Sequence, residues 1–189
     1  MLKAEARKYF REKRLALSVQ QRIKYDDLLL IQLQTIAIPS LTFLLSYWPM
    51  EEMGEPNTHL FTDFLEFQNP GMILCYPKAN FRTVSMEAVQ TNEDTRFRKN
   101  QYNIYEPEAG TVVNPTGIDL IFVPLLAFDK KGVRVGFGKG FYDRYIKMCR
   151  PGCLKIGFSY FEPLEVIEDS NDFDLPLDLC VTPDTVYAF

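Results

Sequence analysis

The chain has 189 residues, of which 47% are hydrophobic and 24% charged, so we expect one domain, residues 1–189, with a substantial buried core. A net charge of −4 argues against non-specific nucleic-acid binding, and no apolar run is long enough to span a membrane. The four cysteines form no CxxC pair and there is one histidine, which argues against a disulfide framework, a zinc site and a histidine-dependent triad. We therefore expect a cytoplasmic protein with reduced thiols.

The N-terminal segment, residues 2–17, has the apolar spacing of a helix, and six basic residues lie within the first fourteen positions. Lys3 and Arg7 are four residues apart, so both side chains lie on one face of this helix. Charge runs are usually solvent-exposed, and we expect this of three other basic residues: Lys8, Arg11 and Lys13.

A second helix is expected to begin at Ser18, because Gln21 stands at the capping-box position and apolar residues recur at helical spacing until shortly before Pro39. Residues 41–47 predict a first buried strand. The following loop, residues 48–55, leaves the carboxyl end of that strand, where α/β sheets place their ligand sites.

The next segments continue an alternation of helices and strands. A helix is predicted over residues 58–67, and strands over residues 72–76 and 84–89, which favours a mainly parallel sheet covered on both faces. Residues 90–117 are polar and rich in turns. Tyr102 or Tyr105 in this segment could stack on a base, but loop tyrosines are common on surfaces, so we assign neither a role.

Residues 119–123 form a short, continuous apolar run directly before Pro124 and predict a buried strand. The loop that follows holds four of the ten glycines of the chain, and residues 141–148 have helical character. Glycines allow left-handed backbone angles and close approach to a ligand, and free N–H groups at a helix start attract anions. The order of strand, glycine loop and helix therefore suits a phosphate group.

Two standard glycine-loop signatures do not fit this segment. Residues 136–140 read GxGxG, one residue short of the dinucleotide-binding spacing GxGxxG. A P-loop requires glycine at position 133 and a hydroxyl residue after the lysine, whereas the chain has Val133 and Gly140. The loop composition favours phosphate binding, but it matches neither the dinucleotide-binding signature nor the P-loop signature.

The C-terminal part predicts two further strands, over residues 154–158 and 179–182. Between them, residues 162–178 hold seven carboxylates and no Lys or Arg, a pattern typical of a solvated loop. Together the elements predict an α/β fold, a single three-layer domain with a mainly parallel sheet.

The string LAFDKKGVRVGFGKGFYDRY, which begins at Leu126, closely resembles the signature of the 5-formyltetrahydrofolate cyclo-ligase (methenyltetrahydrofolate synthetase) family. Val135 replaces the family's leucine, and Phe141 replaces the first of two tyrosines, so the ring is kept and the hydroxyl lost. Weaker similarity extends along the full length. The resemblance implies a topology similar to that of sugar-phosphate isomerases and CoA transferases.

The resemblance also implies a reaction, the ATP- and magnesium-dependent cyclisation of 5-formyltetrahydrofolate to 5,10-methenyltetrahydrofolate, with release of ADP and phosphate. Phosphorylation of the formyl oxygen creates a leaving group that N10 can displace, so the protein's task is positioning and charge neutralisation. We expect a monomer whose partners are ATP and the folate, without nucleic acid or membrane.

Site residues follow from the resemblance by motif position. The expected catalytic residues are Lys139, Tyr142 and Arg134. ATP is expected at Lys3, Arg7, Arg134, Gly136, Phe137, Gly138, Lys139, Gly140, Phe141 and Tyr142. The folate is expected at Leu45, Glu55, Phe137, Gly138, Lys139, Gly140 and Phe141. Mg²⁺ is expected at Asp143 and Asp174.

Some alternatives stay open at this point. Glu51 and Glu52 compete with Glu55 for contact with the pterin, and Phe173 replaces a family histidine next to Asp174. A sugar-phosphate isomerase would need neither ATP nor Mg²⁺, and a nucleotide- or folate-binding protein would show no turnover. Fold similarity alone does not separate these three classes.

Overall fold

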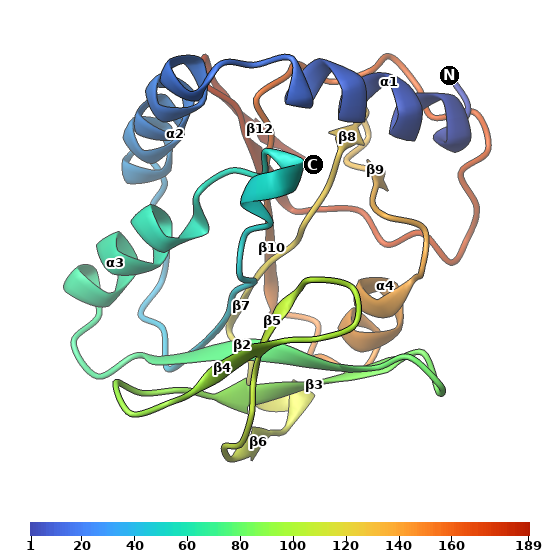
Figure 1. The fold of residues 1–189 in the computed structure, drawn as a ribbon. Coiled ribbons are helices and arrows are strands. Elements are labelled where there is room, and N and C mark those ends of the chain that lie inside the picture. The colour runs from blue at the N-terminus through green and yellow to red at the C-terminus, as the bar shows by residue number, and fades with distance from the viewer.

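The structure is a computed structural model that describes residues 1–189, with helices on both sides of an eight-stranded sheet (Figure 1). The helices are α1 (Lys3–Leu15), α2 (Val19–Gln34), α3 (Thr58–Gln68) and α4 (Phe141–Ile146), with the 3-10 helices η1 (Glu51–Met53) and η2 (Pro115–Gly117). The strands are β1 (Phe43–Leu45), β2 (Ile73–Asn80), β3 (Ser85–Gln90), β4 (Phe97–Lys99), β5 (Tyr105–Pro107), β6 (Val112–Val113), β7 (Leu120–Phe122), β8 (Ala127–Phe128), β9 (Arg134–Val135), β10 (Leu154–Phe158), β11 (Leu179–Val181) and β12 (Val186–Ala188).

The main sheet has the strand order β12-β11-β10-β7-β1-β2-β3-β6. Its centre, from β11 to β2, is parallel, and β12, β3 and β6 add antiparallel pairs at the two edges. In the middle, Leu44 of β1 lies opposite Leu74 of β2 and Leu120 of β7. The predicted α/β fold with a mainly parallel sheet is confirmed.

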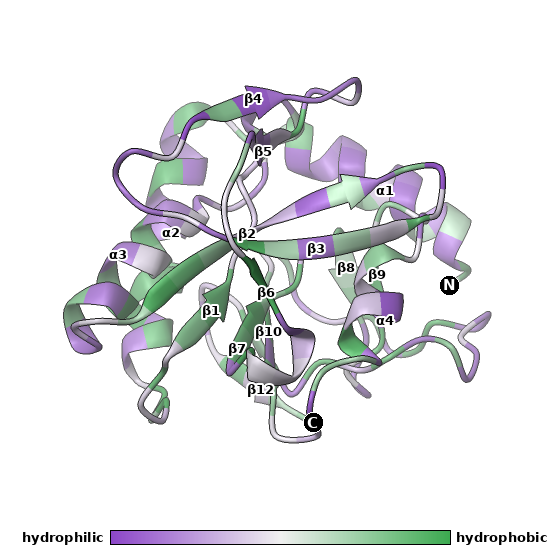
Figure 2. Ribbon diagram, turned by 90° about the horizontal axis from the view of Figure 1, so that it is seen from below, coloured by the Kyte–Doolittle hydropathy of each residue, from purple (hydrophilic) through white to green (hydrophobic).

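Alternate residues of the central strands point to opposite faces and enter two separate cores. Leu44 and Leu120 pack in the core that α1, α2 and α3 cover, whereas Leu45 and Ile121 pack in the core that α4 covers. Figure 1 shows α2 and α3 on one side of β7 and β10, and α4 on the other. In Figure 2 the strands β1 and β7 are coloured as hydrophobic, as expected for strands covered on both faces.

The start of α2 follows from local chemistry, as its sequence predicts. The Ser18 hydroxyl accepts a hydrogen bond from the Gln21 N–H (3.2 Å), and the Gln21 side chain accepts one from the Ser18 N–H (2.8 Å). This capping box satisfies two N–H groups that the first helical turn leaves without partners. None of the helices combines the length and the apolar character needed to cross a membrane.

The glycine loop contains an unpredicted hairpin, β8–β9, which the buried Asp129 organises. The Asp129 carboxylate accepts hydrogen bonds from the N–H groups of Lys131 (2.9 Å), Val133 (3.1 Å) and Ile167 (3.0 Å). The hairpin strands have two residues each, which is too short to leave a periodic pattern in the sequence. For the same reason β4, β5 and β6 were not predicted within residues 90–117.

The chain diverges at the centre of the sheet. From β1 it passes through α3 to β2, and from β7 it passes through α4 to β10, on the opposite face and in the opposite direction along the sheet. Because β1 and β7 are adjacent and parallel, a crevice opens beyond their carboxyl ends. The loop after β1 and the glycine loop after β7 lie on its two sides.

Close packing at Gly157 of β10 gives a test of this core. A Cβ added there would lie 2.4 Å from Leu125 Cδ2 and 2.8 Å from Leu177 Cδ1. We expect Gly157→Ala to lower the free energy of unfolding by about 1–3 kcal/mol, because both buried leucines must move. Gly152→Ala is the matched control, since a Cβ there meets no atom within 4 Å. Urea unfolding followed by Trp48 fluorescence measures the difference, and equal stability of the two variants would contradict this packing.

Candidate active site

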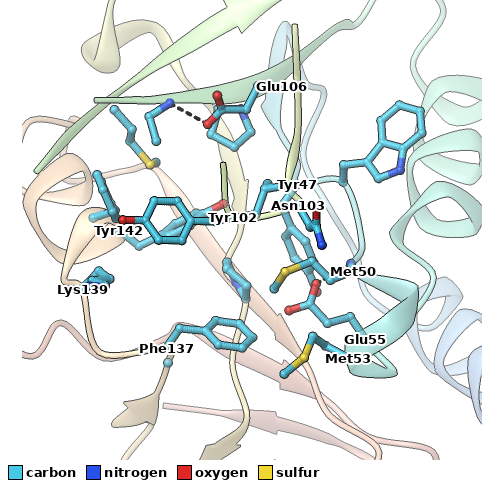
Figure 3. Close-up of a pocket in the computed structure, with 18 of the residues that line it drawn as sticks. Tyr47, Met50, Met53, Glu55, Tyr102, Asn103, Glu106, Phe137, Lys139 and Tyr142 are labelled. Atoms are coloured by element: carbon cyan, nitrogen blue, oxygen red, sulfur yellow. Dashed lines mark hydrogen bonds between the residues drawn. The ribbon is translucent and has the colours of Figure 1, made fainter. Parts of the chain in front are cut away.

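A cavity of about 500 Å³ occupies the crevice at the carboxyl ends of β1 and β7. This volume is typical of sites for cofactors and other small molecules. The walls come from the loop after β1, the β2–β3 hairpin, the segment between β4 and β5, and the glycine loop leading into α4. Figure 3 shows one group of side chains facing another across the cavity: Tyr47, Met50, Met53 and Glu55 opposite Phe137, Lys139 and Tyr142.

The glycine-loop wall depends on two backbone conformations that favour glycine. Gly138 has φ +87° and Gly140 has φ +71°, both in the left-handed region where other residues are strained. Lys139 lies between them, lines the cavity, and takes part in none of the ion pairs of the protein. This wall therefore presents backbone N–H groups and one free ammonium, which together suit an anion.

Arg134 of β9 also lines the cavity, and it is 8% exposed. Its Nη1 donates to the carbonyl oxygen of Leu175 (2.6 Å), and its Nη2 donates to Asp143 Oδ1 (2.9 Å). These bonds hold the guanidinium in one position at the base of the glycine loop. Arg134 adds a fixed positive charge to the wall that carries Lys139.

The opposite wall presents a buried carboxylate, Glu55, at the end of the loop after β1. Its Oε2 accepts a hydrogen bond from the Met50 N–H (2.8 Å), whereas Oε1 has no hydrogen-bond partner. Burial raises the pKa of the Glu55 carboxyl, and the Arg14 guanidinium opposes that rise. Among the three glutamates that competed for this place, Glu51 is exposed and does not line the cavity, whereas Glu52 lines it but pairs with Lys99.

Arg14 lies behind Glu55 and was not among the predicted site residues. It is 3% exposed, and its Nη2 lies 4.0 Å from Glu55 Oε1. The signal that could have found it is the helical spacing, because Arg14 is seven residues after Arg7 and therefore lies on the same face of α1. Exposure of the other three basic residues of this helix is confirmed: Lys8, Arg11 and Lys13.

Lys3 and Arg7 do not line the cavity, but both contact segments that border it. The Arg7 Nε donates to the carbonyl oxygen of Gly136 (2.9 Å), and its guanidinium covers Gly138, where an added Cβ would lie 3.3 Å from Arg7 Cζ. Lys3 Nζ pairs with Asp174 Oδ2 (2.5 Å). The helix α1 therefore places one cation on the glycine loop and a second on the acidic segment.

Asp143 and Asp174 lie close together, although α4 and the acidic segment are distant in sequence. The N–H of Leu175 donates to Asp143 Oδ1 (3.2 Å), which places the two aspartates on adjoining segments. Each is already paired with a cation, Asp143 with Arg134 and Asp174 with Lys3. No group of three or more His, Cys, Asp or Glu side chains is arranged to hold a metal ion by itself.

Aromatic side chains close the cavity near the start of α4. The Phe81 ring lies 4.2 Å from the Tyr102 ring and 5.2 Å from the Phe141 ring, measured between centroids. All three line the cavity, and so does Tyr142. Burial, and then the nearby Glu55, raise the pKa of the Tyr142 hydroxyl, so the group stays protonated at neutral pH. Tyr102, to which the sequence assigned no role, is therefore part of this wall.

Five predicted site residues do not line the cavity: Lys3, Arg7, Asp143, Asp174 and Leu45. Leu45 differs from the other four. Its side chain is fully buried in the α4-side core and does not line the cavity. Tyr47, two residues further along the chain, lines the cavity instead. The reason is that the crevice opens beyond the end of β1, whereas Leu45 is still within the strand.

The two walls differ in what they can bind. One offers the ammonium of Lys139, the guanidinium of Arg134 and backbone N–H groups, which suit phosphate oxygens. The other offers a free carboxylate oxygen of Glu55, which suits an N–H donor. The arrangement can hold a phosphate group and an N–H donor side by side in one cavity.

Comparison with known proteins assigns the family. The 5-formyltetrahydrofolate cyclo-ligase family model matches residues 2–183. A 5-formyltetrahydrofolate cyclo-ligase from Mycoplasma pneumoniae is 30% identical over 186 residues, covering 96% of this chain and 98% of that protein. Local similarity is higher in the Mycoplasma genitalium relative, 48% over 69 residues, but that match spans 42% of its length. The mouse relative, 40% identical over 86 residues, is also matched over 42% of its length.

Solved structures give the same result. The chain is similar to a 5,10-methenyltetrahydrofolate synthetase from Aquifex aeolicus, with TM-score 0.77 and 31% identity, over 100% of this chain and 93% of that one. A 5,10-methenyltetrahydrofolate synthetase from Mycoplasma pneumoniae matches with TM-score 0.73 and 25% identity, over 96% and 98% of the two chains. Because the family model, the full-length relative and the fold agree over nearly the whole sequence, this chain belongs to the 5-formyltetrahydrofolate cyclo-ligase family.

Proposed function

We propose that the protein catalyses the ATP- and magnesium-dependent cyclisation of 5-formyltetrahydrofolate to 5,10-methenyltetrahydrofolate, with release of ADP and phosphate. The observation that carries the proposal is the pairing of two unlike walls in one cavity. Lys139 and the loop backbone suit the phosphates of ATP, and the free oxygen of Glu55 suits the N–H donors of a pterin ring. Membership of the family supports the same reaction.

The chemistry explains why the protein needs two substrates side by side. The formyl oxygen attacks the γ-phosphorus of ATP, and ADP leaves. The formyl carbon then carries a phosphate leaving group, and N10 attacks that carbon. Loss of the N10 proton and departure of phosphate complete the 5,10-methenyl bridge. Because every bond that forms joins atoms of the two substrates, the protein contributes alignment and charge neutralisation.

The residues of the cavity divide this work. Lys139, Arg134 and the backbone of residues 136–140 hold the phosphates, and the aromatic rings of Phe137 and Phe141 line the folate. The protonated Tyr142 hydroxyl can donate a hydrogen bond to an oxygen on which charge develops. Because Phe141 has no hydroxyl, this donor role falls to Tyr142.

Asp143 and Asp174 fit the ligand preferences of Mg²⁺, which takes one or two carboxylates and fills its other positions with phosphate oxygens and water. When bound, the ion would neutralise charge on the transferred phosphoryl group. Both carboxylates are paired with cations in this structure, Asp143 with Arg134 and Asp174 with Lys3. The bonds to these carboxylates go to Asp143 Oδ1 and Asp174 Oδ2, so the other oxygen of each aspartate would be the one that holds the metal ion.

The direct test is the absorbance of the methenyl product formed from 5-formyltetrahydrofolate. We expect product in the mixture that contains ATP and Mg²⁺, one ADP per product, and none when ATP or Mg²⁺ is left out. Product formation that needs no ATP would reject the proposal. So would binding of both substrates without turnover in any mixture.

Lys139→Ala tests the phosphate wall. Because a charge-assisted bond to phosphate contributes about 1.5–3 kcal/mol, we expect the KM for ATP to rise roughly tenfold or more while the KM for the folate changes little. Lys131→Ala is the matched control, since Lys131 is exposed on the β8–β9 hairpin away from the cavity. Steady-state kinetics with each substrate varied in turn separate the two constants. A rise in the folate KM alone would place Lys139 on the other substrate.

Asp143→Asn and Asp174→Asn test the proposed metal site. We expect each to raise the Mg²⁺ concentration needed for half-maximal turnover, and the double variant to be much less than additive, because the first loss already disables the site. Calorimetry of ATP binding with and without Mg²⁺ gives a readout independent of turnover. Asp172→Asn is the control, because Asp172 is exposed in the same segment. A parental Mg²⁺ dependence in both single variants would reject the assignment.

A further inference from the structure

Arg14 is a buried cation to which the proposed reaction gives no role. It extends from α1 into the space between the two loops that flank the cavity. Its Nε donates to the carbonyl oxygen of Met53 (2.8 Å), and its Nη1 donates to the carbonyl oxygen of Leu125 (3.2 Å). These bonds fix the guanidinium relative to the loop after β1 and the loop after β7 at the same time.

The third nitrogen of this guanidinium faces Glu55 without bonding to it. Nη2 of Arg14 lies 4.0 Å from Glu55 Oε1, which is too long for a hydrogen bond. Both atoms are buried and have no hydrogen-bond partner, while Oε2 is held by the Met50 N–H. The negative charge of Glu55 is therefore compensated by a nearby cation, and one of its oxygens stays free.

Arg14 is the cation that acts on Glu55 in this environment. The other titratable groups that face the carboxylate are the phenols of Tyr47 at the end of β1 and Tyr142 of α4. Tyr160 contacts the backbone carbonyl of Glu55 through its hydroxyl (3.5 Å). Burial raises the pKa of the Glu55 carboxyl, and the Arg14 charge, followed by the hydrogen bond from the Met50 N–H, opposes the rise.

We infer that Arg14 is a positioning residue, which keeps Glu55 ionised and directed into the cavity while leaving Oε1 free to accept hydrogen bonds from the N–H donors of the folate's pterin ring. A carboxylate bonded face to face with a guanidinium would use both of its oxygens. Here Arg14 donates its hydrogen bonds to two backbone carbonyls instead. Its positive charge therefore stabilises the Glu55 carboxylate without occupying Oε1. This inference rests on the proposed function, because it takes the folate as the ligand of Glu55.

Arg14→Met tests the inference, because methionine fills much of the buried volume and removes the charge. We expect the Kd for 5-formyltetrahydrofolate to rise roughly tenfold or more at neutral pH, since an uncompensated buried carboxylate takes up a proton. The ionised form of Glu55 binds the ligand, so affinity falls as the pH drops through its pKa. With Arg14 removed that pKa is higher, and the loss of affinity should begin at a higher pH than in the parent.

The binding is measured by the fluorescence of Trp48, the one tryptophan of the chain, which lines the cavity. Arg14→Lys keeps the charge and loses the fork of nitrogens, so it should return the pH dependence toward that of the parent even if the protein is less stable. Arg11→Met is the matched control on the same helix, because Arg11 is exposed, and it should leave the Kd and its pH dependence unchanged. In a Glu55→Gln background, Arg14→Met should change the Kd little.

The outcomes separate a positioning role from a merely structural one. Lower stability of Arg14→Met with an unchanged pH dependence of folate binding would overturn the inference, and so would equal behaviour of Arg14→Lys and Arg14→Met. If Arg14→Met does not fold, two comparisons decide the question. One is Arg14→Lys against the parent, and the other is Glu55→Gln with and without Arg14→Met. A parent that binds the folate but forms no product rejects the proposed function and leaves the Arg14 inference to be judged by the binding curves. A parent that binds no folate rejects both.

Discussion

The opposite directions taken by the chain after β1 and after β7 are the constraint on which the cavity depends. One connection covers the sheet with α3 and the other covers the opposite face with α4. Neither loop can therefore lie across the end of the neighbouring strand, and a crevice remains between two parallel strands. The loop after β1 and the glycine loop after β7 form the two facing walls of the cavity, and the parallel pairing of β1 with β7 holds these walls at a fixed separation.

The first helix connects the parts that this topology leaves apart. One face of α1 carries three cations, and each reaches a different segment: Lys3 pairs with Asp174, Arg7 bonds to the carbonyl of Gly136, and Arg14 lies against the loop that holds Glu55. The helix thereby fixes the positions of the acidic segment, the glycine loop and the loop after β1 relative to one another. An apolar side of the same helix, with Ala6 and Phe10 in the core, fixes its position.

The site keeps polar groups that a stable core would not leave without partners. Arg14 Nη2, Glu55 Oε1 and the Tyr145 hydroxyl are all buried without hydrogen bonds. Each such group costs about 1–3 kcal/mol relative to a satisfied one. For Glu55 this cost has an explanation in the proposed function, because a ligand with N–H donors would satisfy the carboxylate. Such a ligand would not satisfy Arg14 Nη2, which is itself a donor. For Tyr145, a residue of α4 whose side chain is buried in the core, the structure offers no such partner.

The sequence by itself determined the features that depend on local spacing. Neighbouring residues alone predict the capping box at Ser18, the buried strand before Pro124 and the glycine loop. The loop motif was also enough to indicate the family. Only the tertiary structure decided which side chains reach the cavity. Leu45 is in the core because it is still part of β1, and Oε1 of Glu55 is free while Arg14 bonds to backbone carbonyls of two other segments. Such arrangements depend on where strands end and on contacts between distant segments, and neither leaves a periodic signal in the sequence.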